Sequence, residues 1–184
     1  MKRSLIALTL AAALPFSAMA ADGISYNYVE GGYARTNADG GADADGWALK
    51  GSGAISPNFH LFGGYDQQKI DNTDVKLKHA QAGVGYNRAI TTSTDFVTKV
   101  AYENYKATGY KQDGYSVEGG VKSRLAPNFI GSASLGYEDG DNVDGDVYGR
   151  LGAEVKFTPN WSVAGDVKIA DGATGFFVGP RYTF

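Results

Sequence analysis

The chain has 184 residues, enough for one domain of ordinary size, and it contains 26 glycines, 12 tyrosines and 9 phenylalanines. Its formal net charge is −3, and an acidic chain without a basic run is poorly suited to binding nucleic acid. Because cysteine is absent, disulfides, thiol chemistry and Cys-ligated metal sites are excluded.

The start of the chain has the parts of an export signal. Two basic residues are followed by an apolar run over residues 5–14 and by the small residues of Ala18-Met19-Ala20. The apolar run is shorter than the roughly 20 residues that a membrane-spanning helix needs. The predicted division is a signal peptide over 1–20, cleaved before Ala21, and an exported domain over 21–184.

The exported domain alternates between apolar and polar residues almost throughout. In 147–157, Val147, Leu151 and Val155 share one face with small residues, while Arg150 and Glu154 lie on the other. A period of two over about ten residues predicts a strand with one apolar and one polar face. Ten strands are expected, with eight as the alternative count: 23–34, 46–55, 59–70, 76–88, 95–107, 114–125, 129–138, 146–157, 161–170 and 175–184.

Two kinds of connection separate these strands. Short turns carry Pro-Asn, which sets turn dihedrals and ends strand pairing, or lie at 91–95. Longer acidic, glycine-rich loops are expected between them, at 36–45, 71–74, 108–113, 139–146 and 171–174. The strict alternation of the two kinds predicts a series of hairpins, and Glu30-Gly31-Gly32 suggests a bulge in the first strand.

The aromatic residues favour a membrane barrel with its apolar face outward. Aromatic belts at both ends of an apolar band match the two headgroup layers of a membrane. The two expected girdles comprise Phe59, Phe96, Phe129, Phe157 and Trp161 by the short turns, and Trp47, Tyr65, Tyr102, Tyr115 and Tyr137 by the loops. The last strand ends on an aromatic row that resembles the insertion signal of outer-membrane barrels: Phe176, Val178, Tyr182 and Phe184.

The polar face predicts a charged interior. Both signs interleave along the strands, so salt-bridge ladders are expected to fill most of the narrow lumen of a ten-stranded barrel. The predicted network comprises Lys50, Lys99, Glu103, Glu118, Lys122, Arg124, Glu138, Arg150, Glu154, Lys156, Asp166, Lys168 and Arg181. For Arg150, we expect a carboxylate from Glu154 or Asp166. His60 and His79 also fall on this face and are expected to form hydrogen bonds.

Residues that would support catalysis or a cofactor are not apparent. There is no nucleophile elbow with a Ser-His-Asp order and no phosphate-cradling loop. The acidic stretch 139–146 lacks the ligand spacing and late Glu of a calcium loop. We therefore expect no enzyme activity, no cofactor and no metal site.

Several segments resemble the Ax-twenty-one family of small outer-membrane proteins, also called sulfation-dependent quorum factors. The matching segments are Ser25-Tyr26-Asn27, Val29-Glu30-Gly31, 43–47, 57–60 and, above all, 68–83. The resemblance implies an outer-membrane location, release in outer-membrane vesicles, and roles in quorum sensing, biofilm, motility and host recognition. It places the proposed sulfated tyrosine at Tyr26, which our strand assignment puts in strand 1, facing lipid.

Together these features predict an antiparallel up-and-down transmembrane β-barrel in the outer membrane. The expected role is structural or surface interaction, as a monomer. Expected partners are outer-membrane lipid, lipopolysaccharide and, during insertion, the barrel assembly machinery. The alternatives are a narrow porin-like channel, a secreted soluble lipid-binding barrel with its apolar face inward, and a secreted amyloid built from the glycine- and tyrosine-rich repeats.

Overall fold

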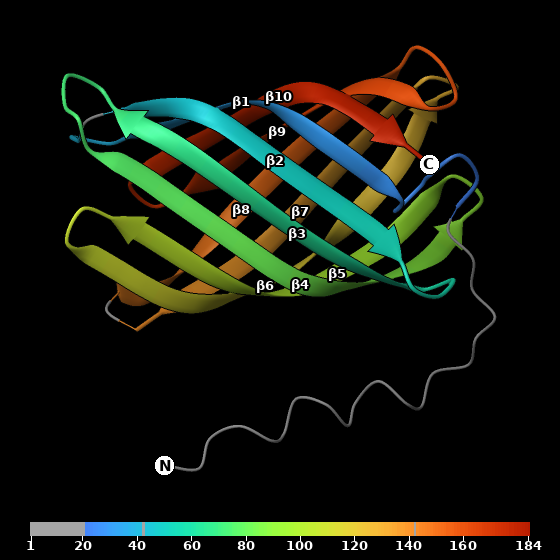
Figure 1. Ribbon diagram of the computed structural model, residues 1–184. Helices are drawn as coiled ribbons and strands as arrows, with labels where there is room; N and C mark the ends of the chain where they lie inside the picture. Colours follow the sequence, from blue (N-terminus) through green and yellow to red (C-terminus); the bar gives the residue numbers. More distant parts are fainter. Residues whose placement is uncertain (1–20, 42, 142) are drawn as a thin grey trace.

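A computed structural model describes residues 21–41, 43–141 and 143–184; the predicted signal peptide lies outside them. These residues form one closed antiparallel barrel in which each strand pairs with its neighbours in sequence and β1 pairs with β10 (Figure 1). The prediction of ten strands is confirmed, and the alternative of eight is wrong. No helix in the described ranges is long and apolar enough to cross a membrane. The strands are β1 Tyr28–Ala38, β2 Ala44–Ala54, β3 Phe59–Ile70, β4 Lys76–Thr91, β5 Thr94–Ala107, β6 Tyr110–Ala126, β7 Phe129–Gly140, β8 Val143–Lys156, β9 Trp161–Ala170 and β10 Ala173–Thr183.

Four of the five acidic connections are shorter than the sequence suggested, and the fifth, between β3 and β4, covers 71–75. β5 and β6 are joined by Thr108 and Gly109 alone, and β9 and β10 by Asp171 and Gly172. Both glycines, each the second residue of its turn, have positive φ, 75° and 73°, a conformation that costs glycine little and other residues more. Acidic residues that we assigned to loops, such as Asp113, therefore extend the strands instead.

The first strand differs most from its prediction. β1 covers 28–38 rather than 23–34, and residues 21–27 precede it as an irregular segment. The expected bulge is wrong, because the pairing of β1 with β10 keeps one register from Glu30–Arg181 to Tyr33–Val178. A Cβ at Gly32 would overlap the Val178 carbonyl, so glycine is needed here for close approach of the two backbones that close the barrel.

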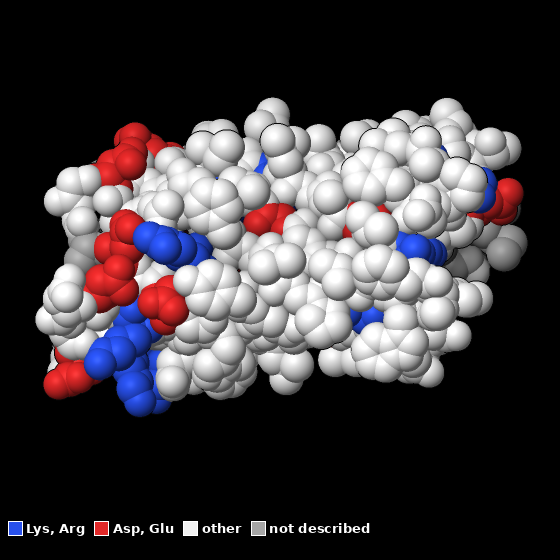
Figure 2. Space-filling view, turned by 90° about the horizontal axis from the view of Figure 1, so that it is seen from above, with Lys and Arg blue, Asp and Glu red and all other residues white. Residues whose placement is uncertain are grey.

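The outer face of the barrel is apolar, as predicted. Leu135 and Leu151 are 69% and 59% exposed, and charged side chains gather mainly toward the two ends of the molecule in Figure 2. The ring centroids of Trp47 and Tyr65 lie 5.5 Å apart near the acidic connections, and those of Trp161 and Tyr182 lie 5.1 Å apart near the short turns. The exposed large side chains also include Phe96, Tyr102, Tyr115, Tyr137, Phe157, Phe176, Val178 and Phe184, while Phe59 and Phe129 are partly buried.

The assignment of faces on the first strand was wrong. Tyr33 is 47% exposed and lies opposite Trp47, so odd-numbered residues of β1 face outward. Glu30 is buried and faces the lumen. Because side chains alternate strictly, an error of one residue exchanges the two faces, and our assignment had turned Tyr26 rather than Tyr33 outward.

Candidate functional site

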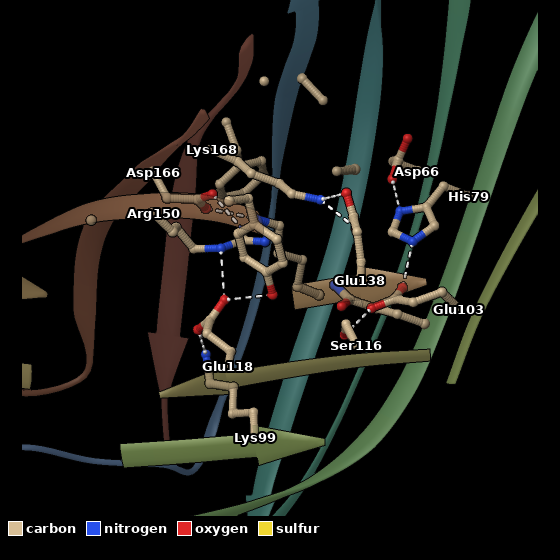
Figure 3. Close-up of a pocket in the computed structure, with 18 of the residues that line it drawn as sticks. Asp66, His79, Lys99, Glu103, Ser116, Glu118, Glu138, Arg150, Asp166 and Lys168 are labelled. Carbon is tan, nitrogen blue, oxygen red and sulfur yellow. Dashed lines mark hydrogen bonds and ion pairs between the residues drawn. The ribbon is translucent and has the colours of Figure 1, made fainter. Parts of the chain in front are cut away.

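The middle of the lumen holds a chain of ion pairs that crosses the barrel (Figure 3). Lys50 Nζ lies 2.7 Å from Asp166 Oδ2, and Arg150 Nη1 lies 2.8 Å from Asp166 Oδ1. Arg150 Nε and Lys99 Nζ each lie 3.2 Å from Glu118. The chain joins β2, β9, β8, β6 and β5, so it braces opposite walls. Of the two carboxylates that we expected for Arg150, Asp166 lies beside it, whereas Glu154 pairs with Arg181.

A second cluster lies toward the acidic connections and is centred on His79 (Figure 3). Its Nδ1 lies 2.9 Å from Asp66 Oδ1, and its Nε2 lies 2.7 Å from Glu103 Oε2. The Ser116 hydroxyl donates to the other oxygen of Glu103 at 2.7 Å. The hydrogen-bonding role expected for His79 is confirmed, and both ring nitrogens are engaged. Nearby, Lys168 Nζ lies 2.6 Å from Glu138.

A third cluster lies toward the short turns, where Arg181 joins two carboxylates. Its guanidinium lies 2.5 Å from Glu30 and 2.7 Å from Glu154, and Ser162 donates to Glu154 at 3.0 Å. The Arg181 guanidinium also lies 4.1 Å from the ring centroid of Tyr28. Glu30 was missed as a member of the network because the two faces of the first strand were exchanged.

Residues 21–27, here called the N-terminal segment, enter the lumen at its short-turn end. Ala21, Ile24 and Tyr26 are buried and cluster with Val97 of β5. The ring of Tyr26 stacks on that of His60 with centroids 4.6 Å apart. We had predicted a strand here, because an irregular apolar segment next to a strand has the same sequence pattern as the strand itself.

Three basic residues of the predicted network contact the N-terminal segment and do not pair with a carboxylate. Lys156 Nζ donates to the Gly23 carbonyl at 2.8 Å, and Lys122 Nζ donates to the Ser25 carbonyl at 3.4 Å. The side chain of Arg124 lies against Gly23. The salt-bridge ladders that we expected do not include them, because none of the three forms an ion pair among the described residues.

Tyr26 is the anchor of this segment and not a lipid-facing residue of strand 1, as we had predicted. It is 7% exposed, and its hydroxyl donates to Asp95 Oδ2 at 2.8 Å. Burial and the adjacent Asp95 carboxylate raise the pKa of Tyr26, so the phenol remains a proton donor. Asp95, which we placed where the turn 91–95 meets the strand 95–107, is fully buried near the start of β5.

Space remains inside the barrel above this plug. A cavity of about 750 Å³ is lined by residues from all ten strands, among them Glu118, Arg150 and Asp166. Within the described residues, no group of three or more His, Asp or Glu side chains is arranged to hold a metal ion. Charged side chains that line it, such as Glu118, Arg150 and Asp166, are paired with one another, whereas the cavity of a lipid carrier is lined mainly by apolar side chains with few polar groups.

No family model matches the chain, and no curated protein matches it. Among solved structures, the KdgM porin is 16% identical, with a TM-score of 0.47 over 85% of this chain and 99% of that one. The Neisserial surface protein A is also 16% identical, with a TM-score of 0.45 over 87% of this chain and 98% of that one. Ail, the attachment invasion locus protein of Yersinia pestis, is 14% identical, with a TM-score of 0.40 over 87% and 100%.

Proposed function

We propose that the protein is a non-enzymatic outer-membrane barrel whose lumen is closed and whose outer surface performs its function. The observation that carries this proposal is the N-terminal segment, which fills the short-turn end of the lumen. Above it, ion pairs bridge opposite walls. A wall-to-wall network of this kind stabilises the barrel and obstructs a continuous water path.

The spacing of the two girdles supports the membrane location. Phe129 and Tyr137 are eight residues apart on the outer face of β7. This separation is about 26 Å along the strand, or about 20 Å along the membrane normal at a tilt of about 40°. The intervening outer side chains are apolar, as an environment of acyl chains demands. A soluble lipid-binding barrel would need the opposite arrangement of faces.

A row of lysines above the loop-side girdle supports lipopolysaccharide as the lipid partner. Lys78 lies directly opposite Lys106, and Lys106 lies opposite Lys111. Like charges in adjacent cross-strand positions repel, so an anion between them would stabilise the row. Lys78, Lys106 and the girdle residue Tyr65 also line a surface hollow of about 240 Å³. We infer that this hollow receives a phosphate group of lipopolysaccharide beside its acyl chains.

Replacing both Lys78 and Lys106 with glutamine should weaken binding of lipopolysaccharide. Each basic residue near an anionic lipid surface contributes about 1 kcal/mol, so the pair should account for roughly a thirtyfold change in affinity at low salt. Titration of the purified barrel with lipopolysaccharide measures this. Arg88→Gln, on the same strand at the short-turn end, is the matched control and should have little effect. Unchanged affinity in the double variant would exclude the lysine row as a lipid site.

A narrow channel is the second candidate, favoured by the 750 Å³ cavity. Planar-bilayer recording separates the two functions. The full barrel should conduct little or nothing, because the N-terminal segment closes one end. A variant lacking residues 22–26 should show larger and more frequent openings if that segment is the obstruction. Steady, ion-selective conductance by the intact protein would reject the closed barrel in favour of a pore.

The resemblance to the Ax-twenty-one family suggests a further role in vesicle release and cell-to-cell signalling. A surface barrel shed with outer-membrane vesicles is compatible with such a role. Tyr26, the position of the proposed sulfation, has its hydroxyl buried against Asp95 in the folded barrel. We therefore do not include sulfated Tyr26 in the proposed function. Comparing vesicles from cells with and without the gene for their effect on biofilm would test the signalling role.

A further inference from the structure

Asp95 is a buried carboxyl group that the ion pairs of the lumen do not compensate. Its side chain is fully buried at the short-turn end of the barrel. Taking an ionised carboxylate out of water is costly unless a cation or several hydrogen-bond donors compensate. Yet in the part of the chain that the structure describes, no lysine or arginine forms an ion pair with Asp95.

The basic residue that lies opposite Asp95 in the sheet forms its contacts with other groups. Lys122 is the cross-strand neighbour of Asp95 in the pairing of β5 with β6. Its Nζ donates to the Ser25 carbonyl at 3.4 Å and lies 5.2 Å from the ring centroid of Tyr26. It therefore holds the N-terminal segment in place and leaves the carboxylate to other donors.

Among the described residues, two donors reach Asp95, and both belong to the N-terminal segment. The Tyr26 hydroxyl donates to Oδ2 at 2.8 Å, and the backbone nitrogen of Ala21 donates to Oδ1 at 2.7 Å. Ala21 is itself only 4% exposed. Its position coincides with the cleavage site that the export signal predicts, so the nitrogen beside Asp95 would be the first atom of the processed chain.

We propose that Asp95 is a buried binding site for the α-ammonium group that signal-peptide cleavage creates at Ala21. A peptide N–H supplies one neutral hydrogen bond, whereas an α-ammonium supplies three donors and a full positive charge. Cleavage thus converts the contact at 2.7 Å into an ion pair in a water-poor site, where charge-assisted hydrogen bonds are strong. Processing of the chain thereby locks the N-terminal segment inside the barrel.

The other hydrogen bonds of the N-terminal segment explain why its first residue lies beside Asp95. The Asp22 nitrogen donates to the Thr92 carbonyl at 3.0 Å, and the Lys156 ammonium donates to the Gly23 carbonyl at 2.8 Å. At the other end, the Asn27 side chain accepts from the Ala54 nitrogen at 2.6 Å. Bonds at both ends fix the length of chain between them, so the first residue can reach only this part of the wall.

The first test needs no variant. Mass spectrometry of the membrane fraction should find a chain that begins at Ala21. Reductive methylation should then modify its α-amine at least about tenfold more slowly in the folded barrel than in urea, because a buried amine reacts only after local opening. The exposed amine of Lys76 is an internal control that should react readily in both states. A different first residue, or an α-amine that reacts equally fast in both states, would overturn the proposal.

The second test separates the ammonium from an ordinary packing role of Asp95. Asp95→Asn should expose the α-amine to methylation and lower the urea midpoint of the processed chain. In a chain with one extra glycine before Ala21, the same substitution should have a much smaller effect, because the charge is already displaced. Equal losses in the two chains would refute the site. A loss that disappears in a Lys122→Gln background would show that Lys122 is the counter-ion, which would refute it as well.

Discussion

Arg150→Leu is expected to destabilise the folded barrel by up to about 3 kcal/mol, because it removes one member of a partly buried network and leaves its partners charged. Asp166 would keep only Lys50, and Glu118 would keep Lys99 and the Tyr148 hydroxyl. Urea unfolding in lipid vesicles measures the loss. Part of it should be recovered at acidic pH, where protonation removes the charge from the orphaned carboxylates.

A surface ion pair supplies the control for this prediction. Lys69 lies 3.0 Å from Asp74, with both side chains largely exposed near the turn between β3 and β4. Exposed pairs contribute little to stability, so Lys69→Leu should leave the unfolding curve nearly unchanged. If Arg150→Leu were as mild as this control, the lumen network would not brace the barrel in the way we describe.

Leu151→Arg is expected to lower the free energy of unfolding by about 2–4 kcal/mol. The mechanism differs from that of Arg150→Leu, because the new charge lies among acyl chains near the membrane midplane. Leu151 lies midway along β8 between Val147, opposite Tyr137 of one girdle, and Val155, opposite Phe129 of the other. The neighbouring residue Arg150 faces the lumen. Unfolding of this variant in vesicles therefore tests the orientation of the faces independently of the ion pairs.

Val147, which lies at a shallower depth in the membrane, provides the matched control for Leu151. Val147→Arg introduces the same charge at girdle level, where the side chain can reach the headgroups, and should cost only about 0–1 kcal/mol. Equal penalties at the two positions would indicate that lipid depth does not matter. A barrel that unfolds identically in plain buffer and in vesicles would contradict the membrane location itself.

Several parts of the site could be predicted because they depend on alternation along single strands. The period of two placed Arg150, Glu118 and Asp166 on one face and Leu151 on the other, and the aromatic positions indicated the girdles. Alternation could not identify ion-pair partners, since Arg150 meets Glu118 of a strand that is not its neighbour. Such contacts depend on how the sheet closes and how far each side chain reaches across the lumen.

By itself, the sequence determined the class of fold and the apolar outer face and favoured ten strands over eight, because alternation and turns are local patterns that recur along the chain. Only the tertiary structure decided the course of residues 21–27. Nothing in their local pattern separates a lumen plug from the start of a strand, and the difference arises where Tyr26 meets His60 and Asp95. Those partners come from β3 and β5, and only closure of the barrel brings them together with the first residues of the exported domain.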